Sequence, residues 1–458
     1  MQTYILNPLD SRYRNTTESL AAIFSEQGFF KYRTLVEVRY FIMLSESEKV
    51  GLRKLTMLEK DYLESLCDLS QEDYNLIKQI ELQGYGNIPA TKHDLKALEY
   101  FLKIKLKNTT LADTSEWVHF ALTTWDITSV AYGLMLSDAI SKILLPKLAE
   151  ILEHMQTLAK KHARLPMLAR THGQPASPTT MGKQCAVFAE RLSRQIDQLK
   201  SFQLLVKFSG ATGNYNAHYA AYPTVDWVDF SEKFISSFNT QRHVLLSLNN
   251  YTTQIEPNDT YAELCDILKR IHTILLNINQ DMWRYISDGW VKQKQVAGEI
   301  GSSAMPHKVN PINFENSEGN LGLANAILSF FSSKLPISRL QRDLSDSSVQ
   351  RNFGVAFGYA LVAYEALNMG LSSIEVDELA IVQALREHPE VIAEGIQTIL
   401  RREGVPMPYE QLKALTRGKT ITLAEIHTFI DNLDIPSPLK VELKKLDPVT
   451  YIGNSAIF

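Results

Sequence analysis

The stretch from Gly298 to Pro311 concentrates side chains that can bind or react. Its two glycines and two prolines oppose a regular helix or strand, so the sequence predicts a shaped loop. The polar set along it comprises Ser302, Ser303, His307, Lys308 and Asn310, with Val309 between the last two. Backbone N–H groups beside a lysine suit an anion, because amide dipoles and a point charge add at short range. Composition alone also fits a polar surface loop, whereas the order Gly-Ser-Ser-x-Met-Pro-x-Lys-x-Asn-Pro is far more specific.

A second polar segment runs from Arg170 to Pro175 and contains His172. Histidine titrates near neutral pH, which suits proton transfer. The flanking Arg, Gly and Pro exclude a histidine packed on an apolar helix face, so we expect His172 in a loop that points into a cleft. No second His or carboxylate stands at ligand spacing, which disfavours a metal. A lone histidine is still more often structural than functional.

Hydroxyl and arginine side chains recur in two further segments. Thr123 and Thr124 precede a helical pattern, where hydroxyls and N–H groups form a natural carboxylate cradle. The segment Ser338–Asn352 supplies the fork geometry of arginine and short serine donors, both suited to phosphates and carboxylates. Its candidate residues are Arg342, Ser347, Ser348 and Arg351. The alternative is a solvated helix face in which Asp343 and Asp346 pair with Arg339 or Arg342.

Two segments near the N-terminus complete the polar set. Thr91 and Asp94 have the spacing of a capping box, which would place His93 in the first helical turn, after Lys92. The positive end of the helix dipole there attracts anions. Without a ligand, His93 would be a side chain of the cap region. The residues Asp10–Tyr13, which include Arg12, are too polar for a core and would alone suggest a flexible terminus.

The ordered string around Ser302 resembles the signature of the fumarase/aspartase superfamily, whose members eliminate fumarate from a substituted succinate. His307, between Pro306 and Lys308, resembles the adenylosuccinate lyase branch, and the similarity is closest to its bacterial form. The segments Lys92–Asp94, Arg170–Ala176 and Tyr251–Pro257 agree with that branch, and the resemblance extends from Asp10 to about Ile452. The chain departs from the usual Thr-Ser-x-Asp at Thr123–Asp126, although Thr124 keeps the hydroxyl.

The resemblance implies a C–N lyase of purine biosynthesis that needs no cofactor and no metal. It would release fumarate from adenylosuccinate to give AMP, and from the succinylated aminoimidazole carboxamide ribotide (SAICAR) to give AICAR. His172 would be the general acid. Ser302 would be the base, although residue chemistry alone favours an anion-binding or helix-capping hydroxyl there. The implied substrate-binding residues are Arg12, Tyr13, Lys92, His93, Asp94, Thr123, Thr124, Gln254, Ser303, Lys308, Val309, Asn310, Asn316, Arg342, Ser347, Ser348 and Arg351.

Two other functions stay open at this point. Another fumarate-releasing lyase of the superfamily would act on argininosuccinate or a small dicarboxylate, and His307 with the Arg-rich segment argues against it. A helical scaffold without catalysis would show a broken site, yet Ser302, His172 and Lys308 are all present.

The bulk properties limit the partners and the compartment. A formal net charge of -4 argues against a nucleic-acid surface, so an anionic substrate must be drawn by a local basic cluster. The three cysteines, Cys67, Cys185 and Cys265, are far apart in sequence and suggest reduced core residues of a cytoplasmic protein. No basic-then-apolar leader begins the sequence, and no apolar run reaches the ~18 residues of a membrane span. We therefore expect a soluble, intracellular protein without a membrane partner.

The elements that must position these residues are long helices. Gly and Pro are scarce, and apolar residues recur at three- and four-residue steps along three stretches. These stretches are Leu144–Leu158, Cys185–Val206 and Leu264–Tyr285. We predict an all-α protein with an N-terminal helical domain (1–112), a central long-helix bundle (113–363) and a small C-terminal helical domain (364–458). Stripes of this length commonly serve a second partner surface, and the resemblance implies a homotetramer whose active sites are shared between subunits.

Overall fold

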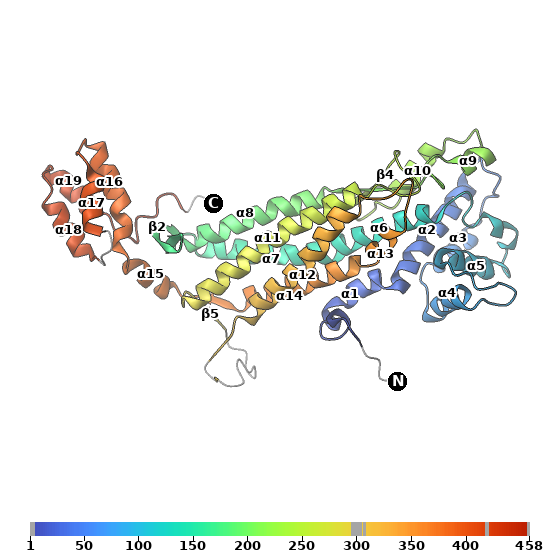
Figure 1. Ribbon diagram of the computed structural model, residues 1–458, viewed down its shortest axis with the longest axis horizontal. Coiled ribbons are helices and arrows are strands. Elements are labelled where there is room, and N and C mark those ends of the chain that lie inside the picture. The colour runs from blue at the N-terminus through green and yellow to red at the C-terminus, as the bar shows by residue number, and fades with distance from the viewer. Residues whose placement is uncertain (1–4, 295–304, 306–307, 417–420, 456–458) are drawn as a thin grey trace. The chain divides into compact units, whose positions relative to one another are not determined.

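The computed structural model describes residues 5–294, 305, 308–416 and 421–455. Helices dominate the ribbon in Figure 1. Strands form only three short two-stranded sheets among the described residues. The predicted all-α class is therefore confirmed in its main feature, and the short sheets are an addition that helical periodicity did not predict.

The chain divides into two compact units, each of which is described by itself. The first unit contains Met1–Leu148, Gln195–Thr273 and Gly319–Glu365, and the second contains Ala149–Arg194, Ile274–Glu318 and Ala366–Phe458. Their boundaries fall inside the longest helices. The predicted division into three domains stays a prediction.

The five helices that contain these boundaries carry most of the predicted apolar stripes. They are α7 (Leu145–Lys161), α8 (Met181–Lys200), α11 (Asp259–Ser287), α12 (Ile312–Lys334) and α14 (Phe353–Ser372). On α11, Leu264, Ile267 and Ile271 are buried at three- and four-residue steps, as predicted. The prediction of one helical stripe over Cys185–Val206 is wrong at its C-terminal end, because α8 ends at Lys200. Val206 instead belongs to a strand, in which the buried Leu204 and Val206 alternate with the exposed Gln203 and the half-buried Leu205.

The first unit contains most of the shorter helices of the N-terminal half. Its elements are η1 (Pro8–Asp10), α1 (Arg14–Phe24), α2 (Glu26–Glu46), α3 (Met57–Ser65), α4 (Gln71–Leu82), α5 (Asp94–Leu106), η2 (Ala112–Trp117), α6 (Thr124–Ala139), β3 (Gln203–Val206), α9 (Asn216–Ala221), α10 (Trp227–Ser236), β4 (Leu245–Leu248) and α13 (Ser345–Gln350). Strands β3 and β4 pair in parallel. Helix α6 packs against α2, and most of its residues are buried.

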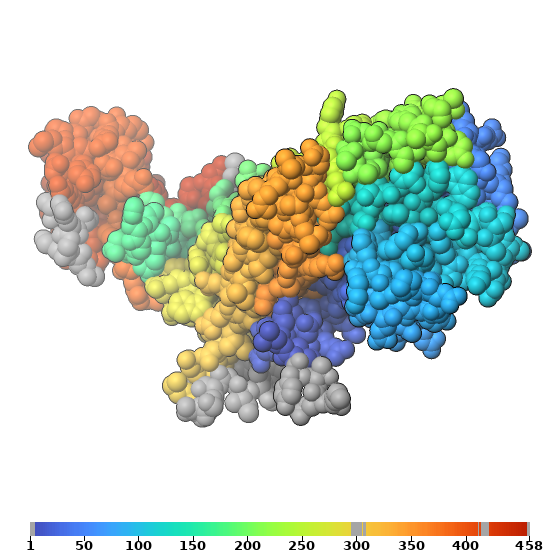
Figure 2. Space-filling view, turned by 45° about the vertical axis from the view of Figure 1, so that its right-hand side comes forward, coloured from blue at the N-terminus to red at the C-terminus, as the bar shows by residue number. Residues whose placement is uncertain are grey.

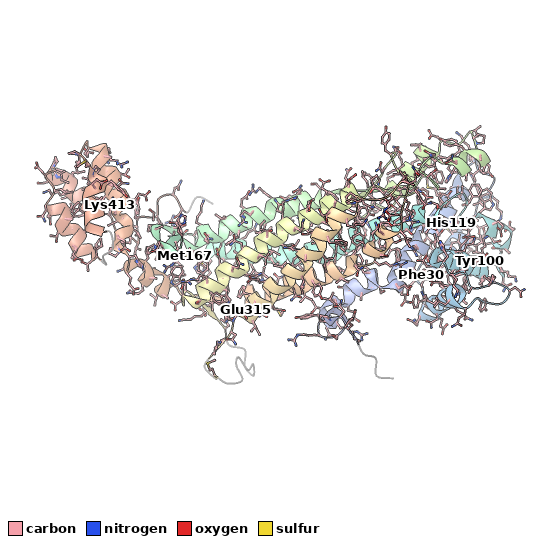
Figure 3. All side chains as sticks on the ribbon, viewed as in Figure 1. Phe30, Tyr100, His119, Met167, Glu315 and Lys413 are labelled. Carbon is pink, nitrogen blue, oxygen red and sulfur yellow. The ribbon has the colours of Figure 1, made fainter. Side chains whose placement is uncertain are left out.

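The second unit contains two antiparallel ribbons and a set of C-terminal helices. Its elements are β1 (Pro166–Thr171), β2 (Gln174–Thr180), β5 (Val291–Gln293), β6 (Ile374–Val376), α15 (Glu378–Arg386), η4 (Pro389–Ile392), α16 (Ala393–Arg402), α17 (Pro408–Thr416), α18 (Leu423–Asp431) and α19 (Ser437–Lys444). β1 pairs with β2, and β5 pairs with β6, both antiparallel. Met167, labelled in Figure 3, lies in the buried base of the β1–β2 ribbon.

One helix has the length and composition of a membrane span, contrary to the expectation that no segment would qualify. It runs through α6, the π-helical turn Ile140–Leu144 and α7, from Thr124 to Lys161. The expectation considered only unbroken apolar runs, whereas the aliphatic residues of this helix outweigh its scattered hydroxyl and acidic residues in the mean hydropathy. Within the protein, 83% of its most apolar window is buried, as in the core helix of a soluble protein.

Candidate active site

His172 lies at the tip of a β-hairpin. The turn between β1 and β2 consists of His172 and Gly173, which have φ values of 53° and 75°. Two positive φ values are the requirement of a type I′ turn, whose twist matches that of the strands. The base of the hairpin is buried at Met167 and Leu168, while the stretch 170–174 is exposed. The predicted loop is therefore a tight turn, and His172 is exposed in this chain instead of lying in a cleft.

The signature segment is described only in part, because Ser302, Ser303 and His307 lie outside the described residues. The described stretch 308–311 forms neither helix nor strand, as predicted. The Lys308 N–H donates to the Met305 carbonyl at 3.1 Å, and the Gln293 side chain donates to the Val309 carbonyl at 3.0 Å. Lys308 and Val309 are exposed, whereas Asn310 and Asn316, the latter on α12, are half-buried.

The two threonines Thr123 and Thr124 lie at the N-terminus of α6, as predicted. The Thr123 N–H donates to Asp126 Oδ2 at 2.8 Å, so Asp126 closes the first turn. Both threonines are half-buried. The free N–H groups and the dipole of this 16-residue helix favour an anion at its start.

A buried ion pair beneath this helix start was not predicted from the sequence. Lys207 Nζ lies 2.6 Å from Asp126 Oδ1, and both side chains are fully buried. The same oxygen accepts from the N–H groups of Ser209 at 2.8 Å and Gly210 at 3.1 Å. Burial lowers the pKa of Lys207, and the Asp126 carboxylate opposes that shift. A lysine between Val206 and Phe208, at the end of an apolar strand, was the available signal.

Asp94 joins two arginines. Its Oδ2 accepts from Arg33 Nη1 at 2.8 Å and from Arg351 Nη2 at 3.0 Å. The two guanidinium groups lie 3.8 Å and 5.9 Å from the centre of the Phe29 ring. Burial alone would raise the pKa of Asp94, but the Arg33 charge and the hydrogen bonds outweigh it and hold that pKa below its usual range. Arg351 therefore pairs with Asp94, which lies in the N-terminal part of the chain. Arg339 pairs with Asp343, 3.3 Å away, as expected for the alternative of a salt-bridged helix face.

The capping box predicted from Thr91 and Asp94 is wrong by two residues. Helix α5 begins at Asp94, and His93 is its N-cap, with Nδ1 accepting from the Lys96 N–H at 3.2 Å. The Asp94 carboxylate is engaged by the arginines, so the imidazole takes over the capping role. This bond needs a lone pair on Nδ1, which leaves Nε2 to carry the hydrogen. His93 and Lys92 are exposed.

Gln254 and Arg342 contact each other. Arg342 Nη1 donates to Gln254 Oε1 at 3.1 Å, and its guanidinium lies 4.8 Å from the centre of the Trp125 ring. Burial lowers the pKa of Arg342 despite the nearby carboxylates of Asp346 and Asp343. Arg342 thus joins the Arg-rich segment to the Gln254 loop and to the start of α6.

The Gln254 loop is closed by a buried carboxyl group. Glu256 accepts from the Asn249 side chain at 2.9 Å and from the Asn258 N–H. Burial raises the pKa of Glu256 to about 7. Thr253 also donates to the Gln341 carbonyl at 2.8 Å, which holds the loop against the Arg-rich segment.

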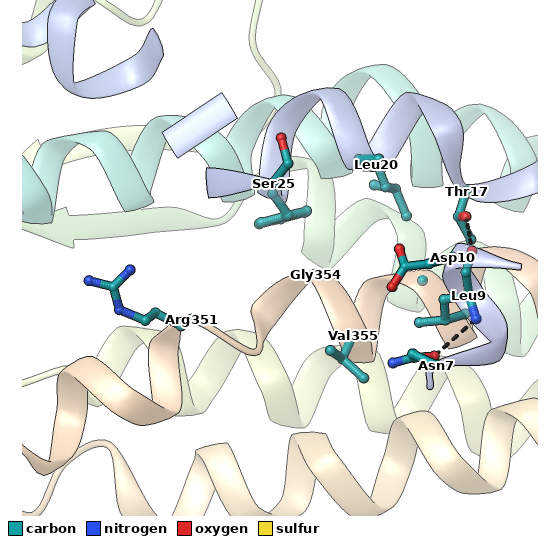
Figure 4. Close-up of a pocket in the computed structure, with 12 residues that line it drawn as sticks. Asn7, Leu9, Asp10, Thr17, Leu20, Ser25, Arg351, Gly354 and Val355 are labelled. Atoms are coloured by element: carbon teal, nitrogen blue, oxygen red, sulfur yellow. Dashed lines mark hydrogen bonds between the residues drawn. The ribbon is translucent and has the colours of Figure 1, made fainter. Parts of the chain in front are cut away.

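The remaining predicted residues lie at the edges of this region. Ser347 and Ser348 lie on the six-residue helix α13. Arg12 is exposed, with its guanidinium 5.9 Å from the centre of the Tyr13 ring, and Tyr13 precedes α1. A cavity of about 170 Å³ lies between α1 and α14, with Arg351 at one side and Asn7 and Asp10 at the other (Figure 4).

No group of three or more His, Cys, Asp or Glu side chains that could hold a metal ion occurs among the described residues. Within the first unit the structure brings Asp94 to Arg351 and Gln254 to Arg342. His172 and the described signature residues belong to the second unit.

Comparisons with protein families match nearly the whole chain. Residues 11–327 match the family model described as Lyase, and residues 338–452 match the model described as Adenylosuccinate lyase C-terminal. Among curated proteins, the chain is 47% identical over 451 residues to adenylosuccinate lyase of Haemophilus influenzae, covering 98% of this chain and 96% of that protein. It is 46% identical over 455 residues to that of Escherichia coli K12, with the same coverage of both chains.

Solved structures of lower identity share the fold. A fumarate lyase from Mesorhizobium sp. BNC1 superposes with a TM-score of 0.72 at 18% identity and covers 96% of both chains. A 3-carboxy-cis,cis-muconate lactonizing enzyme from Pseudomonas putida gives a TM-score of 0.71 at 19% identity, covering 96% of this chain and 95% of that one.

Proposed function

Since the chain belongs to the adenylosuccinate lyase family and is a C–N lyase of purine biosynthesis, we propose how its residues divide the elimination of fumarate from adenylosuccinate. The observation that carries this proposal is the placement of His172, exposed at the tip of a two-stranded hairpin whose base is buried. An imidazole exposed at such a tip is available to a bound substrate.

Ser302 removes a proton from the succinyl carbon, and His172 protonates the departing nitrogen as general acid. Support for Ser302 comes from its place as the first serine of the signature string. The carbanion delocalises into the adjacent carboxylate, and Lys308, Asn310 and loop amides stabilise the doubly charged form. This electron sink belongs to the substrate, so the reaction requires neither a cofactor nor a metal.

The first unit and the signature segment hold the substrate in this proposal. The succinyl carboxylates bind at the start of α6 and beside the Gln254 loop, where N–H groups, hydroxyls and an amide converge. The assigned residues are Thr123, Thr124, Gln254 and Ser303. The nucleotide and its phosphate bind to the arginine and hydroxyl groups, because guanidinium forks match phosphate geometry. The assigned residues are Arg12, Tyr13, Lys92, His93, Asp94, Arg342, Ser347, Ser348 and Arg351, with Val309 and Asn316 as further contacts.

The same site would also split SAICAR to AICAR, because that substrate carries the same succinyl group and a ribose phosphate. Phosphate contacts far from the reacting bond contribute binding energy that orients either substrate. Argininosuccinate lacks a phosphate and would leave the proposed phosphate contacts of Arg342 and Arg351 unmade.

A homotetramer is the assembly that we propose. Helix α12 exposes Ile312, Leu323 and Phe330 at spacings of eleven and seven residues, which place them on one helix face. Gly319 and Gly322 leave open space on the exposed side of this helix, and Glu315, labelled in Figure 3, is the exposed residue with a charge. Figure 2 shows the orange surface of this part of the chain uncovered. An apolar, nearly uncharged face of a 23-residue helix suits packing against a second copy.

The cytoplasm is the compartment that fits this assignment. Cys67, Cys185 and Cys265 are all free thiols, and unpaired buried cysteines are typical of proteins from reducing compartments.

The test combines ultraviolet difference absorbance with product analysis. The purified protein should convert adenylosuccinate to AMP and fumarate in equal amounts, and argininosuccinate should give no fumarate. His172→Ala should lose turnover, while the matched variant His243→Ala, which removes another exposed histidine, should keep it. Near-normal turnover in His172→Ala removes the general-acid role and leaves the overall reaction standing.

A further inference from the structure

A short stretch of the second unit contacts the hairpin that carries His172 and the strand that precedes the signature segment. We call the residues Ser373–Arg386 the connector, since they link α14 to the C-terminal helices. The connector begins with the strand β6, which pairs with β5 in the register Val291 to Val376. β5 leads directly into the signature segment, and Gln293 at its end donates to the Val309 carbonyl on the far side of that segment at 3.0 Å. β6 therefore pairs with the strand that precedes the signature segment in the sequence.

The second half of the connector packs on the His172 hairpin. Helix α15 lies against β1 and buries Ile381 and Leu385. Glu378 in its first turn lies 3.1 Å from His162, which follows the last turn of α7 and precedes the hairpin. Beyond the connector, Ser177 of β2 donates to Glu394 of α16. The hairpin is thus anchored along its length while its tip stays exposed.

Asp377 lies between these halves and makes a separate bond with each of its polar groups. Its N–H donates to the Trp290 carbonyl at 2.8 Å, which ends the β5–β6 ribbon. Its Oδ1 accepts from the Ala380 N–H at 3.0 Å, which caps α15, and its Oδ2 lies 2.5 Å from Lys292 Nζ on β5. The Trp290 ring in turn lies 5.9 Å from the Arg170 guanidinium, on the hairpin strand that leads to His172.

We propose that Asp377 is a positioning residue, which fixes α15 against the β5–β6 ribbon and so sets the placement of the His172 hairpin that packs on α15. The inference rests on the proposed role of His172. Proton transfer to a leaving group depends on placement within fractions of an ångström, and supporting contacts set that placement. Among the described side chains of the connector, Asp377 is the one that both bonds to a strand of the ribbon and caps the helix that packs on the hairpin.

The test compares three substitutions at position 377. Asp377→Ala removes both the cap and the ion pair, and should lower kcat by about 10- to 100-fold. The KM for adenylosuccinate should stay within about twofold, because the proposed nucleotide-binding arginines belong to the first unit. Asp377→Asn and Asp377→Ser keep an oxygen for the cap and should restore most of the lost kcat.

Lys292→Met serves as the matched variant, since it removes the ion pair and leaves the cap in place. Its kcat should equal that of Asp377→Asn within about twofold. Amide hydrogen exchange adds a readout that does not depend on turnover: peptides covering 166–180 should exchange faster in Asp377→Ala than in Lys292→Met. Wild-type kcat in Asp377→Ala, or a kcat that neither Asn nor Ser restores, overturns the proposal.

The outcomes separate this proposal from the assignment of His172. If His172→Ala keeps its turnover, the general-acid role fails, and the exchange result alone decides whether Asp377 positions the hairpin. If His172→Ala is inactive and Asp377→Ala behaves like the wild type, the positioning role fails. Should Asp377→Ala not fold, Asp377→Asn and Lys292→Met carry the test: a kcat within about twofold of the wild type, together with faster exchange of the peptides covering 166–180 in both variants, supports the proposal. Wild-type exchange of those peptides in both variants overturns it.

Discussion

The two units hold their polar residues in opposite ways. In the first unit, several predicted binding residues are paired or lie over buried pairs, as in Asp94 with Arg351 and Asp126 with Lys207, while Arg12, Lys92 and His93 are exposed. In the second, His172 is exposed at a turn, and Lys308 is exposed in a stretch that is neither helix nor strand. Buried charges must be paired to be tolerated, whereas an exposed imidazole costs the fold little. The proposed binding half is therefore preorganised by the core, and the proposed reacting half is displayed away from it.

The largest expected effect separates activity from stability in the second unit. His172→Ala should lower kcat about 10²- to 10⁴-fold, the usual contribution of a general acid. The melting temperature should stay near that of the wild type, because the side chain is exposed and no packing is lost. Turnover assays and thermal melting of the same preparation measure both quantities. A large fall in melting temperature would contradict the contrast between the units.

The second-largest expected effect concerns the first unit, where a substitution should lower stability. Lys207→Met leaves the Asp126 carboxylate fully buried without its cation, which should destabilise the protein by about 3–5 kcal/mol. Urea unfolding of the variant and of the exposed control Lys200→Met measures this cost. A loss below about 1 kcal/mol would show that the Ser209 and Gly210 N–H groups alone satisfy Asp126.

These two residues also show what the sequence could and could not predict. Apolar periodicity predicted the long helices, because burial of one helix face is a local property of the chain. His172 was predicted from its polar neighbours, yet its hairpin was missed because a positive φ at a histidine leaves no mark in composition. Lys207 was missed since its partner is 81 residues away in sequence. The pairing of Asp94 with Arg351 was equally beyond reach, so the capping box was assigned to the wrong residues.

A third prediction uses pH to test the buried carboxyl of the Gln254 loop. The pKa of Glu256 is raised to about 7 from an ordinary 4.5, so the folded protein binds more protons than the unfolded chain between these values. Stability should therefore fall as pH rises from about 4.5 to about 7, by about 3 kcal/mol from this group. His218 and His272, whose pKa burial lowers to about 4, contribute the opposite slope. The difference between wild type and Glu256→Gln in urea unfolding at pH 5 and pH 8 isolates the carboxyl, and equal pH slopes would refute the assignment.

The smallest effect tests whether the hairpin turn itself matters to catalysis. Gly173 has a φ of 75°, and a Cβ added there would meet no atom within 4 Å. Gly173→Ala should therefore lower the free energy of unfolding by only about 1 kcal/mol, because alanine disfavours the left-handed backbone conformation of this position. If the type I′ turn orients His172 toward the substrate, kcat should fall by more than the loss of folded enzyme accounts for, with KM unchanged.

Gly404→Ala is the matched control, because Gly404 has a φ of 72°, equally open surroundings and no place in the proposed site. If both variants lose equal stability and kcat falls only in Gly173→Ala, the lower kcat results from a changed orientation of His172. Unchanged kcat in both would mean that the paired strands alone place the imidazole, which would shift the positioning role to the buried base of the hairpin.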